Sequence, residues 1–396
     1  MPGGSRSISS SADEFRPAIP RSGCSPALPV SASPARPNYH APSPRPAKTG
    51  HFYFAGNRTF LLCVDTRFGD TGIVVLRIAH SLDRLRPMMN RRVFSGAIAT
   101  ALLGSSAVGA RKLNLHIGHT GLTWIPLGGR ITPPPPVSPM VDPQYVHAAI
   151  RDIAGLGFYG VELFGNQIEA MEAEGGIGAL LAQHKLPLIS AYCSTNLSDP
   201  AARKDSIAKT LDWARLVRKY NGKVIVVGPN GVRRDSFDFK AHKDDILTTL
   251  NELGKAVTDM GLTPVLHQHT GTCVETRDET YAVMESVDTK VMKFGPDIGQ
   301  LQKGGSDPVQ VVKHFLPLVQ HMHLKDYSGG QEYLGYCPLG QGKVDVPAIL
   351  SMMEGRQTAG LVMVELDSPP PQPASGLENA RIAKAYLEKQ GVSFRS

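Results

Sequence analysis

Cysteine is scarce in this chain, with five among 396 residues. Beyond residue 110 there are only Cys193, Cys273 and Cys337, and their separations match no metal-binding spacing. An odd number of cysteines does not fit a complete disulfide framework. The folded part must therefore be held by a hydrophobic core, and the roughly 285 residues after position 110 are enough to build one.

Most of the chain also lacks a basic excess, although the formal net charge is +7, with 42 Lys and Arg against 35 Asp and Glu. Residues 1–110 hold 13 of the basic residues and 5 of the acidic ones. The remainder has 29 basic and 30 acidic residues, a balance of −1. This distribution removes the main electrostatic argument for a nucleic-acid partner, and we expect none.

Residues 1–87 show no pattern of a folded domain, and their Ser-, Pro-, Ala- and Arg-rich start predicts a disordered extension. Residues 88–110 have a charged start, a short apolar run and a small-residue exit, as in a secretory signal. Arg91 and Arg92, followed by Val and Phe, resemble the twin-arginine export motif. The run is too short and too rich in Ala, Gly and Ser to span a membrane.

An internal export signal is unusual, because such signals begin proteins. Our hypothesis is that translation starts at Met88 or Met89 and that residues 1–87 are an over-extended reading frame. The mature protein is then periplasmic or secreted and has no membrane segment. If translation starts at Met1 instead, we expect a cytoplasmic protein.

From Arg111 onward, short apolar runs alternate with helical patterns. The strands are expected at residues 112–118, 158–163, 186–192, 223–227, 263–269, 290–294, 318–323 and 360–365. Eight strand–helix units in residues 111–396 have the count and size of a (β/α)8 TIM barrel. A doubly wound open sheet is the competing architecture. The first strand lacks a Gly-rich loop after it, and polar residues recur at the strand ends, so we predict the barrel.

Three successive strands of this series end in Asp297, His323 and Glu365. In a parallel barrel these ends meet at one mouth, where such barrels keep their chemistry. Imidazole and carboxylates suit one divalent cation, such as Mn, Co, Fe, Zn or Mg. The structural alternative is that His323 and Asp326 are polar residues that close a strand. Three strand ends in series favour the metal site.

The fifth strand adds two histidines, His267 and His269, which period-two alternation places on the same side. Both can then approach the metal. Glu275 follows in the loop as a candidate general acid or base, or as a carboxylate that favours a helix N-terminus. Glu162 ends the second strand, either as a substrate contact or as part of a structural salt bridge.

Five segments stand out at the expected strand ends and loops: Gly-Val-Glu-Leu (160–163), His-Gln-His-Thr-Gly-Thr-Cys-Val-Glu-Thr (267–276), Gly-Pro-Asp-Ile-Gly (295–299), His-Met-His-Leu-Lys-Asp (321–326) and Pro-Leu-Gly-Gln-Gly-Lys-Val-Asp (338–345). Together they resemble the sugar phosphate isomerase/epimerase superfamily, the xylose-isomerase-like TIM barrels. Within the superfamily, enzymes like inosose (2-keto-myo-inositol) dehydratase are the most similar. The resemblance covers about residues 112–391.

The resemblance implies one divalent cation on ligands from strands five to eight. Asp297, His323 and Glu365 match the last three, and His267 stands where the family commonly has a glutamate. The fourth ligand stays open among His267, His269 and Glu275. The related DNA-repair endonucleases place a metal-binding histidine three residues after the aspartate, where this chain has Gln300, so we do not expect a nuclease.

We therefore expect a metal-dependent lyase or isomerase/epimerase that acts on a keto-sugar or keto-polyol. A base removes the proton next to the carbonyl, the metal stabilises the enediolate, and dehydration is preferred. The alternatives are isomerisation or epimerisation without dehydration, and a non-catalytic exported carbohydrate-binding barrel. The oligomeric state stays open, with a homo-oligomer included.

The candidate acid–base groups are Glu162, His269, Glu275 and Glu365. Glu162 is also a candidate substrate contact. Lys325 is expected to bind a substrate oxygen and assist catalysis, or to pair with Asp326. Trp124 follows the first strand, where it can stack on a sugar face or belong to the core.

Overall fold

The computed structural model describes residues 111–126, 138–356, 362–367, 369 and 373–396. The predicted extension over residues 1–87 and the twin-arginine segment over residues 88–110 lie outside these residues. Within the described ranges, no helix is both long enough and apolar enough to cross a membrane.

Eight parallel strands form one sheet in the order β6-β5-β4-β3-β2-β1-β10-β7. Their bounds are β1 Ile117–Thr120, β2 Val161–Phe164, β3 Leu188–Thr195, β4 Val224–Pro229, β5 Thr263–Leu266, β6 Lys293–Phe294, β7 Met322–Leu324 and β10 Val362–Val364. Parallel bridges between Phe294 and Val319 and between Asp297 and His323 join the two ends of the sheet. The predicted (β/α)8 barrel is confirmed.

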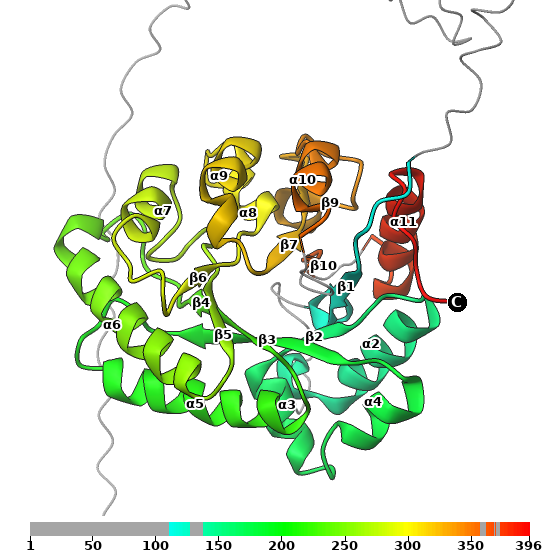
Figure 1. Cartoon of the computed structure of the whole chain (residues 1–396), viewed down its shortest axis with the longest axis horizontal. Coiled ribbons are helices and arrows are strands. Elements are labelled where there is room, and N and C mark those ends of the chain that lie inside the picture. The colour runs from blue at the N-terminus through cyan, green and yellow to red at the C-terminus, as the bar shows by residue number, and fades with distance from the viewer. Residues whose placement is uncertain (1–110, 127–137, 357–361, 368, 370–372) are drawn as a thin grey trace, which may run out of the picture. The chain divides into compact units, whose positions relative to one another are not determined.

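Helices surround the strands (Figure 1). Their bounds are α2 Pro143–Gly155, α3 Gly165–Glu172, α4 Gly178–His184, α5 Arg203–Lys219, α6 Phe239–Asp259, α7 Arg277–Met284, α8 Ile298–Lys303, α9 Pro308–Phe315, α10 Val346–Met353 and α11 Gly376–Lys389. Short 3-10 turns lie at η2 Gly121–Trp124, η3 Pro139–Val141, η4 Leu316–Leu318 and η5 Glu332–Gly335. A small antiparallel pair, β8 Asp326–Tyr327 and β9 Tyr336–Cys337, stands outside the barrel sheet.

Several helices begin where their capping residues predict. Asp142 accepts a hydrogen bond from the backbone of Gln144, and a proline occupies the first turn of α2. Asp307 caps α9 in the same way. Asp199 accepts a hydrogen bond from Ala201 N at 2.9 Å in a turn that leads directly into α5, which begins at Arg203.

The core lies mainly between the sheet and the helices. Along β4, Ile225 and Val227 belong to this main core, while Val224 and Val226 belong to a separate cluster with Val265. This alternation is the period of two that a strand imposes on its side chains. Each buried valine or isoleucine contributes about 1.5–3 kcal/mol, so the core can hold the barrel and leave the strand ends free for polar residues.

Candidate metal centre at the strand ends

The carboxyl ends of the strands gather five polar side chains into one buried cluster. Glu162 comes from β2, Asp297 and His323 are bridged partners after β6 and on β7, and Glu365 follows β10. His267 comes directly after β5. Each of the five is at most 6% exposed. The structure therefore brings together all four predicted metal ligands, although β5 ends at Leu266 and not at His269.

His267, Asp297 and His323 form the centre of the cluster. The Nε2 atom of His267 lies 4.0 Å from Asp297 Oδ2, and the Nδ1 atom of His323 lies 3.9 Å from the same oxygen. Glu365 Oε2 lies 3.1 Å from His323 Nδ1. Both ring nitrogens of His267 are buried and have no hydrogen-bond partner. Atoms that share one cation at about 2.0–2.2 Å lie at such separations, so this donor set fits a divalent ion.

Lys325 places its ammonium group against the same carboxylates. Its Nζ atom lies 3.1 Å from Asp297 Oδ2, 2.5 Å from Glu365 Oε1 and 2.9 Å from Asp367 Oδ2. The side chain is completely buried. The ammonium donates a hydrogen bond to Asp367 Oδ2, and its contacts with Asp297 and Glu365 are ion pairs. This placement disfavours the expected role of Lys325 in binding a substrate oxygen.

The alternative pairing of Lys325 with Asp326 is wrong. The Asp326 carboxylate instead accepts backbone hydrogen bonds from the following loop, including Gly340 N at 3.0 Å and Gly342 N at 2.9 Å. A Cβ atom on Gly342 would come within 2.1 Å of Asp326 Oδ1, so only glycine allows this approach. Asp326 thus organises the loop next to the site and makes no ion pair within it.

The electrostatics of the cluster follow from burial and from these contacts. Burial raises the pKa of Asp297, although Lys325 opposes the shift. Burial alone would raise the pKa of Glu365, but His323 and Lys325 hold it well below its ordinary value. Burial lowers the pKa of His267 well below its ordinary value, and His323 adds to that shift. His267 is therefore neutral and able to donate a lone pair.

His269 differs from His267 because both of its ring nitrogens have partners. Its Nδ1 atom lies 2.7 Å from the carbonyl oxygen of Thr270, and its Nε2 atom lies 2.7 Å from Gln300 Nε2. The carbonyl can only accept, so Nδ1 carries the hydrogen and Nε2 accepts from the amide. Gln300 is itself oriented by Thr270, whose hydroxyl donates to Gln300 Oε1 at 2.7 Å. Of the two histidines, His267 is thus the one whose nitrogens are available to a cation.

Glu162 is held by two histidines and one serine. Its Oε1 atom lies 2.9 Å from His323 Nε2, and its Oε2 atom lies 3.0 Å from His321 Nε2 and 2.6 Å from Ser190 Oγ. Burial alone would raise the pKa of Glu162, but His323 and His321 lower it to about 2. Both oxygens are occupied and the side chain is 2% exposed. This placement disfavours Glu162 as a substrate contact.

Glu275 lies outside the cluster. It accepts a hydrogen bond from the backbone of Gly271 and pairs with Arg234 at 3.4 Å. It therefore links the loop after β5 to the loop after β4, where Gly231 and Thr272 form an antiparallel bridge. No contact joins Glu275 to the described metal-binding groups, which makes it the weakest of the three candidates for the fourth ligand.

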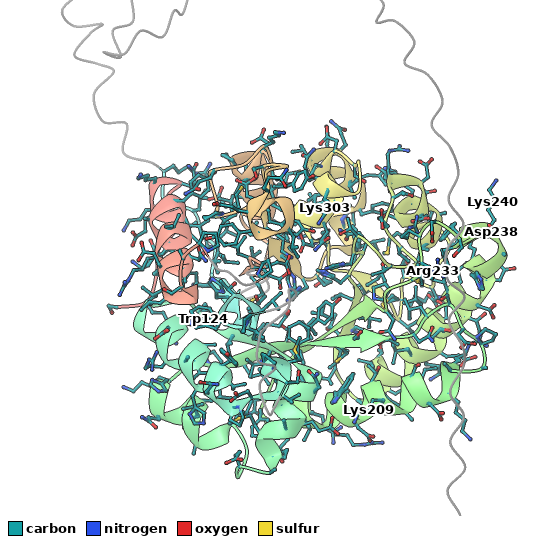
Figure 2. All side chains as sticks on the ribbon, turned by 180° about the vertical axis from the view of Figure 1, so that it is seen from behind. Trp124, Lys209, Arg233, Asp238, Lys240 and Lys303 are labelled. Atoms are coloured by element: carbon teal, nitrogen blue, oxygen red, sulfur yellow. The ribbon has the colours of Figure 1, made fainter. Side chains whose placement is uncertain are left out.

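Trp124 packs between α2 and α11 (Figure 2). It belongs to the main hydrophobic core, and its indole Nε1 donates to Asp152 at 2.9 Å. It is 8% exposed. This position favours a role for Trp124 in the hydrophobic core over stacking on a sugar.

Three residues near the centre were missing from the sequence prediction. Asp367 pairs with Lys325, and Tyr192 places its ring edge-on to His267 with the centroids 5.3 Å apart. Tyr336 lies over the Lys325 ammonium, 4.8 Å from the ring centroid. The rule that polar residues end strands could have found Tyr192, and alternation from Glu365 could have found Asp367. Tyr336 begins β9, outside the barrel sheet, and gave no signal.

The comparison with protein families agrees with this geometry. The profile described as xylose isomerase-like TIM barrel matches residues 150–389. The chain belongs to this family.

The sequence relatives and structural neighbours of this chain include dehydratases and epimerases, and we conclude that this chain is an enzyme too. An inosose dehydratase from Clostridium botulinum (strain Alaska E43 / Type E3) is 24% identical over 268 residues, which cover 61% of this chain and 88% of that protein. The probable 3-DHS dehydratase AsbF from Bacillus anthracis has a TM-score of 0.55 and 16% identity, over 69% of this chain and 99% of that one. The IOLI protein with a bound zinc atom has a TM-score of 0.55 and 15% identity, over 70% and 98% of the two chains. At these identities, the two structures show a shared fold.

Proposed function

We propose that the protein is a divalent-metal-dependent enzyme that removes a proton next to the carbonyl of a keto-sugar or keto-polyol, with dehydration as the preferred outcome. One observation carries the proposal. His267 is buried with two unpartnered ring nitrogens, and it faces Asp297 and His323 at the mouth of a barrel. An apolar or hydrogen-bonded position would not leave both nitrogens without partners, because burying them unpaired is costly.

The charge of the cluster supports a cation. Glu162, Asp297, Glu365 and Asp367 provide four carboxylates, and Lys325 is the ammonium that contacts three of them. Even with His323 protonated, negative charge is in excess by about two, which a buried site does not sustain without a counter-ion. A divalent cation held by His267, Asp297, His323 and Glu365 would take the place of the His323 Nδ1 proton and reduce the excess to about one negative charge. Bound there, the cation would supply Lewis-acid polarisation of a carbonyl oxygen.

His269 is the residue best placed to move the proton. Because Nδ1 donates to the Thr270 carbonyl, the lone pair lies on Nε2, where Gln300 now donates to it. Burial lowers the pKa of His269, and Lys325 adds to that effect, so the imidazole is neutral and can act as a base. A substrate that displaces the Gln300 amide meets this lone pair. The carbon–hydrogen bond breaks, its electrons form the new double bond, and the β-hydroxyl leaves as water with the proton from His269.

The substrate we propose is neutral. A phosphate would add negative charge to a cluster whose carboxylates already exceed its cations, whereas sugar hydroxyls can donate to those carboxylates. The inosose dehydratases among the sequence relatives support a polyol ketone and the dehydration.

The experiment combines metal analysis with proton exchange. The purified protein is expected to carry one divalent ion, to exchange the proton next to a keto-polyol carbonyl with D2O, and to release a product lighter by one water. A chelator should stop both reactions, and the metal should restore them. Exchange without loss of water would favour an isomerase or epimerase. No metal-dependent exchange with any keto-sugar would overturn the proposal in favour of a carbohydrate-binding barrel.

A further inference from the structure

His323 contacts a carboxylate through each of its ring nitrogens. Its Nδ1 atom faces Glu365 at 3.1 Å and Asp297 at 3.9 Å, which is the side of the proposed cation. Its Nε2 atom faces away from those residues and lies 2.9 Å from Glu162 Oε1. A neutral imidazole carries its hydrogen on only one nitrogen. If Nδ1 binds a cation, the hydrogen must be on Nε2, and Glu162 is the acceptor that it meets there.

The fold itself sets the position of Glu162. Glu162 on β2 pairs in register with Ser190 on β3, and the Ser190 hydroxyl donates to Glu162 Oε2 at 2.6 Å. His321 Nε2 lies 3.0 Å from the same oxygen. With Oε2 held by two groups, the carboxylate keeps one orientation, and Oε1 stays directed at His323. The exposure of Glu162 is 2%, so solvent and substrate do not compete for this oxygen.

We infer that Glu162 is a positioning residue that holds His323 in the Nε2-protonated form and so presents Nδ1 to the cation. This inference rests on the proposed metal centre. It assigns Glu162 neither to proton transfer nor to substrate binding, and it leaves His321 as an anchor of the carboxylate. Metal-bound histidines commonly donate their second ring N–H to a carboxylate, and loss of that partner typically weakens metal binding by 10–100-fold.

The test measures metal affinity and the protonation of the His323 ring. Wild-type protein, Glu162→Gln and the control Glu279→Gln are stripped of metal and titrated with Mn²⁺ and Zn²⁺. Glu279 is a suitable control because it is also a buried carboxylate, 8% exposed, and it pairs with Arg234 away from the cluster. Urea unfolding of each variant checks that the barrel is intact. Proton–nitrogen correlation spectra, assigned with a His323→Gln variant, report which ring nitrogen carries the hydrogen.

We expect Glu162→Gln to bind the metal about 10–100-fold more weakly than wild type, to lose the uniform Nε2-protonated signal of His323, and to stay folded. Glu279→Gln should keep wild-type affinity. Equal metal affinity in Glu162→Gln and wild type, or an unchanged His323 signal, would overturn the inference while the metal centre stands. If wild-type protein binds no divalent ion, the proposed function fails instead. A folded Glu162→Gln variant with full metal and no turnover would assign Glu162 to the chemistry and also overturn the inference.

Discussion

Two histidines separated by one residue have different hydrogen-bond partners in this site. His267 has none for either ring nitrogen, whereas His269 donates to Thr270 and accepts from Gln300. The alternation of side chains along a strand puts both on one side but does not distinguish them. What separates the two is a residue 31 positions away, Gln300, because its amide occupies the His269 lone pair.

The first prediction tests this difference. His267→Gln should lose the metal, because a weakly donating amide replaces a ligand, whereas His269→Gln should keep one metal per chain. Turnover in His269→Gln should fall by roughly 10²–10⁴-fold, the usual contribution of a positioned general base. Metal content by mass spectrometry and steady-state rates on the two purified variants give the answer. Loss of metal in His269→Gln, with full metal in His267→Gln, would exchange the two assignments.

The second prediction concerns the buried ammonium of Lys325. Lys325→Met removes the ammonium that contacts Asp297, Glu365 and Asp367, and among the described residues leaves His323 as the cationic group beside the first two. In the presence of chelator, the free energy of unfolding should fall by about 3–5 kcal/mol, the cost of breaking a buried ion pair from one side. Urea unfolding followed by circular dichroism measures the change.

Lys303→Met is the matched control for Lys325→Met. Lys303 also lies near the Tyr336 ring, at 4.6 Å, but its Nζ donates to the carbonyl of Leu334 and contacts no carboxylate in the described residues. We expect a change below about 1 kcal/mol there, as for other surface substitutions. Similar losses in the two variants would show that the three carboxylates do not depend on Lys325.

At the scale of the element, the loop after β7 depends on one carboxylate. Asp326 accepts four backbone hydrogen bonds, from Tyr327 N and Val344 N at Oδ1 and from Gly340 N and Gly342 N at Oδ2. The segment between Tyr327 and Gly340 includes β9, whose first residue, Tyr336, lies over Lys325. An asparagine at this position would replace one carboxylate oxygen by an NH2 group. In either orientation of the amide, two of the four N–H groups would then face a donor instead of an acceptor.

The third prediction is that Asp326→Asn loosens this loop. The free energy of unfolding should fall by about 1–3 kcal/mol, because one buried donor, Val344 N, and three partly buried ones lose a full acceptor. Hydrogen exchange at Gly340, Gly342 and Val344 should become faster, while exchange in β4 stays slow. Asp345→Asn is the control, since Asp345 caps α10 through Ala348 N alone. Unchanged protection at the two glycines would refute the role of Asp326.

The elements were predictable to different degrees, for physical reasons. The eight strands follow from apolar runs, and α2 and α9 follow from an Asp cap with Pro in the first turn. The short helix α8 was not predicted, because Asp297 serves two purposes. Its Oδ1 atom caps α8 by accepting from Gln300 N at 2.9 Å, and its Oδ2 atom faces the site. The sequence pattern indicated the ligand role of Asp297 but not its role as the cap of α8.

At the scale of the whole molecule, the barrel closure decides which side chains meet. The ligand set Asp297, His323 and Glu365 was predictable because parallel strands end at one mouth. The partners of Lys325 were not predictable. Asp326 is its neighbour in the sequence and was an expected partner, whereas its actual partners reach it only because the barrel closes. The same holds for Glu162 and His323, which are 161 positions apart.

The fourth prediction concerns export of the whole chain. If Arg91 and Arg92 belong to a twin-arginine signal, replacing both with lysine should retain the protein in the cytoplasm, because that pathway reads the arginine pair. Fractionation of the native host, with immunodetection of the barrel, measures the distribution. N-terminal sequencing of the exported form locates the cleavage site, and sequencing of the uncleaved form retained in the cytoplasm locates the true start. Normal export of the double variant would exclude the twin-arginine route.

Acid should destabilise the barrel through its buried neutral histidines. Burial lowers the pKa of His119 to about 4, and it also lowers the pKa of His267 and of His321. Each ring stays neutral in the fold while the unfolded chain binds a proton below about pH 6.5. The stability from these groups is therefore present above that pH and is lost as the pH falls toward the folded-state pKa. His323 offsets a small part of this loss near pH 7, where its raised pKa keeps it protonated in the fold while the unfolded ring is still mostly neutral; well below pH 6.5 it is protonated in both states and adds no further change.

The fifth prediction isolates His119, a residue of β1. Its ring packs edge-on against Trp124 and Phe158, and its Nδ1 atom donates to the Thr120 carbonyl. Between pH 7 and pH 5, a pKa of about 4 against 6.5 makes His119 alone account for a loss of about 2 kcal/mol. In His119→Gln, whose amide can still donate to that carbonyl but does not titrate, the loss over the same interval should be smaller by this amount. Urea unfolding of metal-free protein at the two pH values measures both slopes. Glu162 contributes little there, since its pKa is about 2 in the fold and about 4.5 outside it. Equal losses in variant and wild type would show that His119 is protonated in the fold and that its apolar surroundings do not keep it neutral.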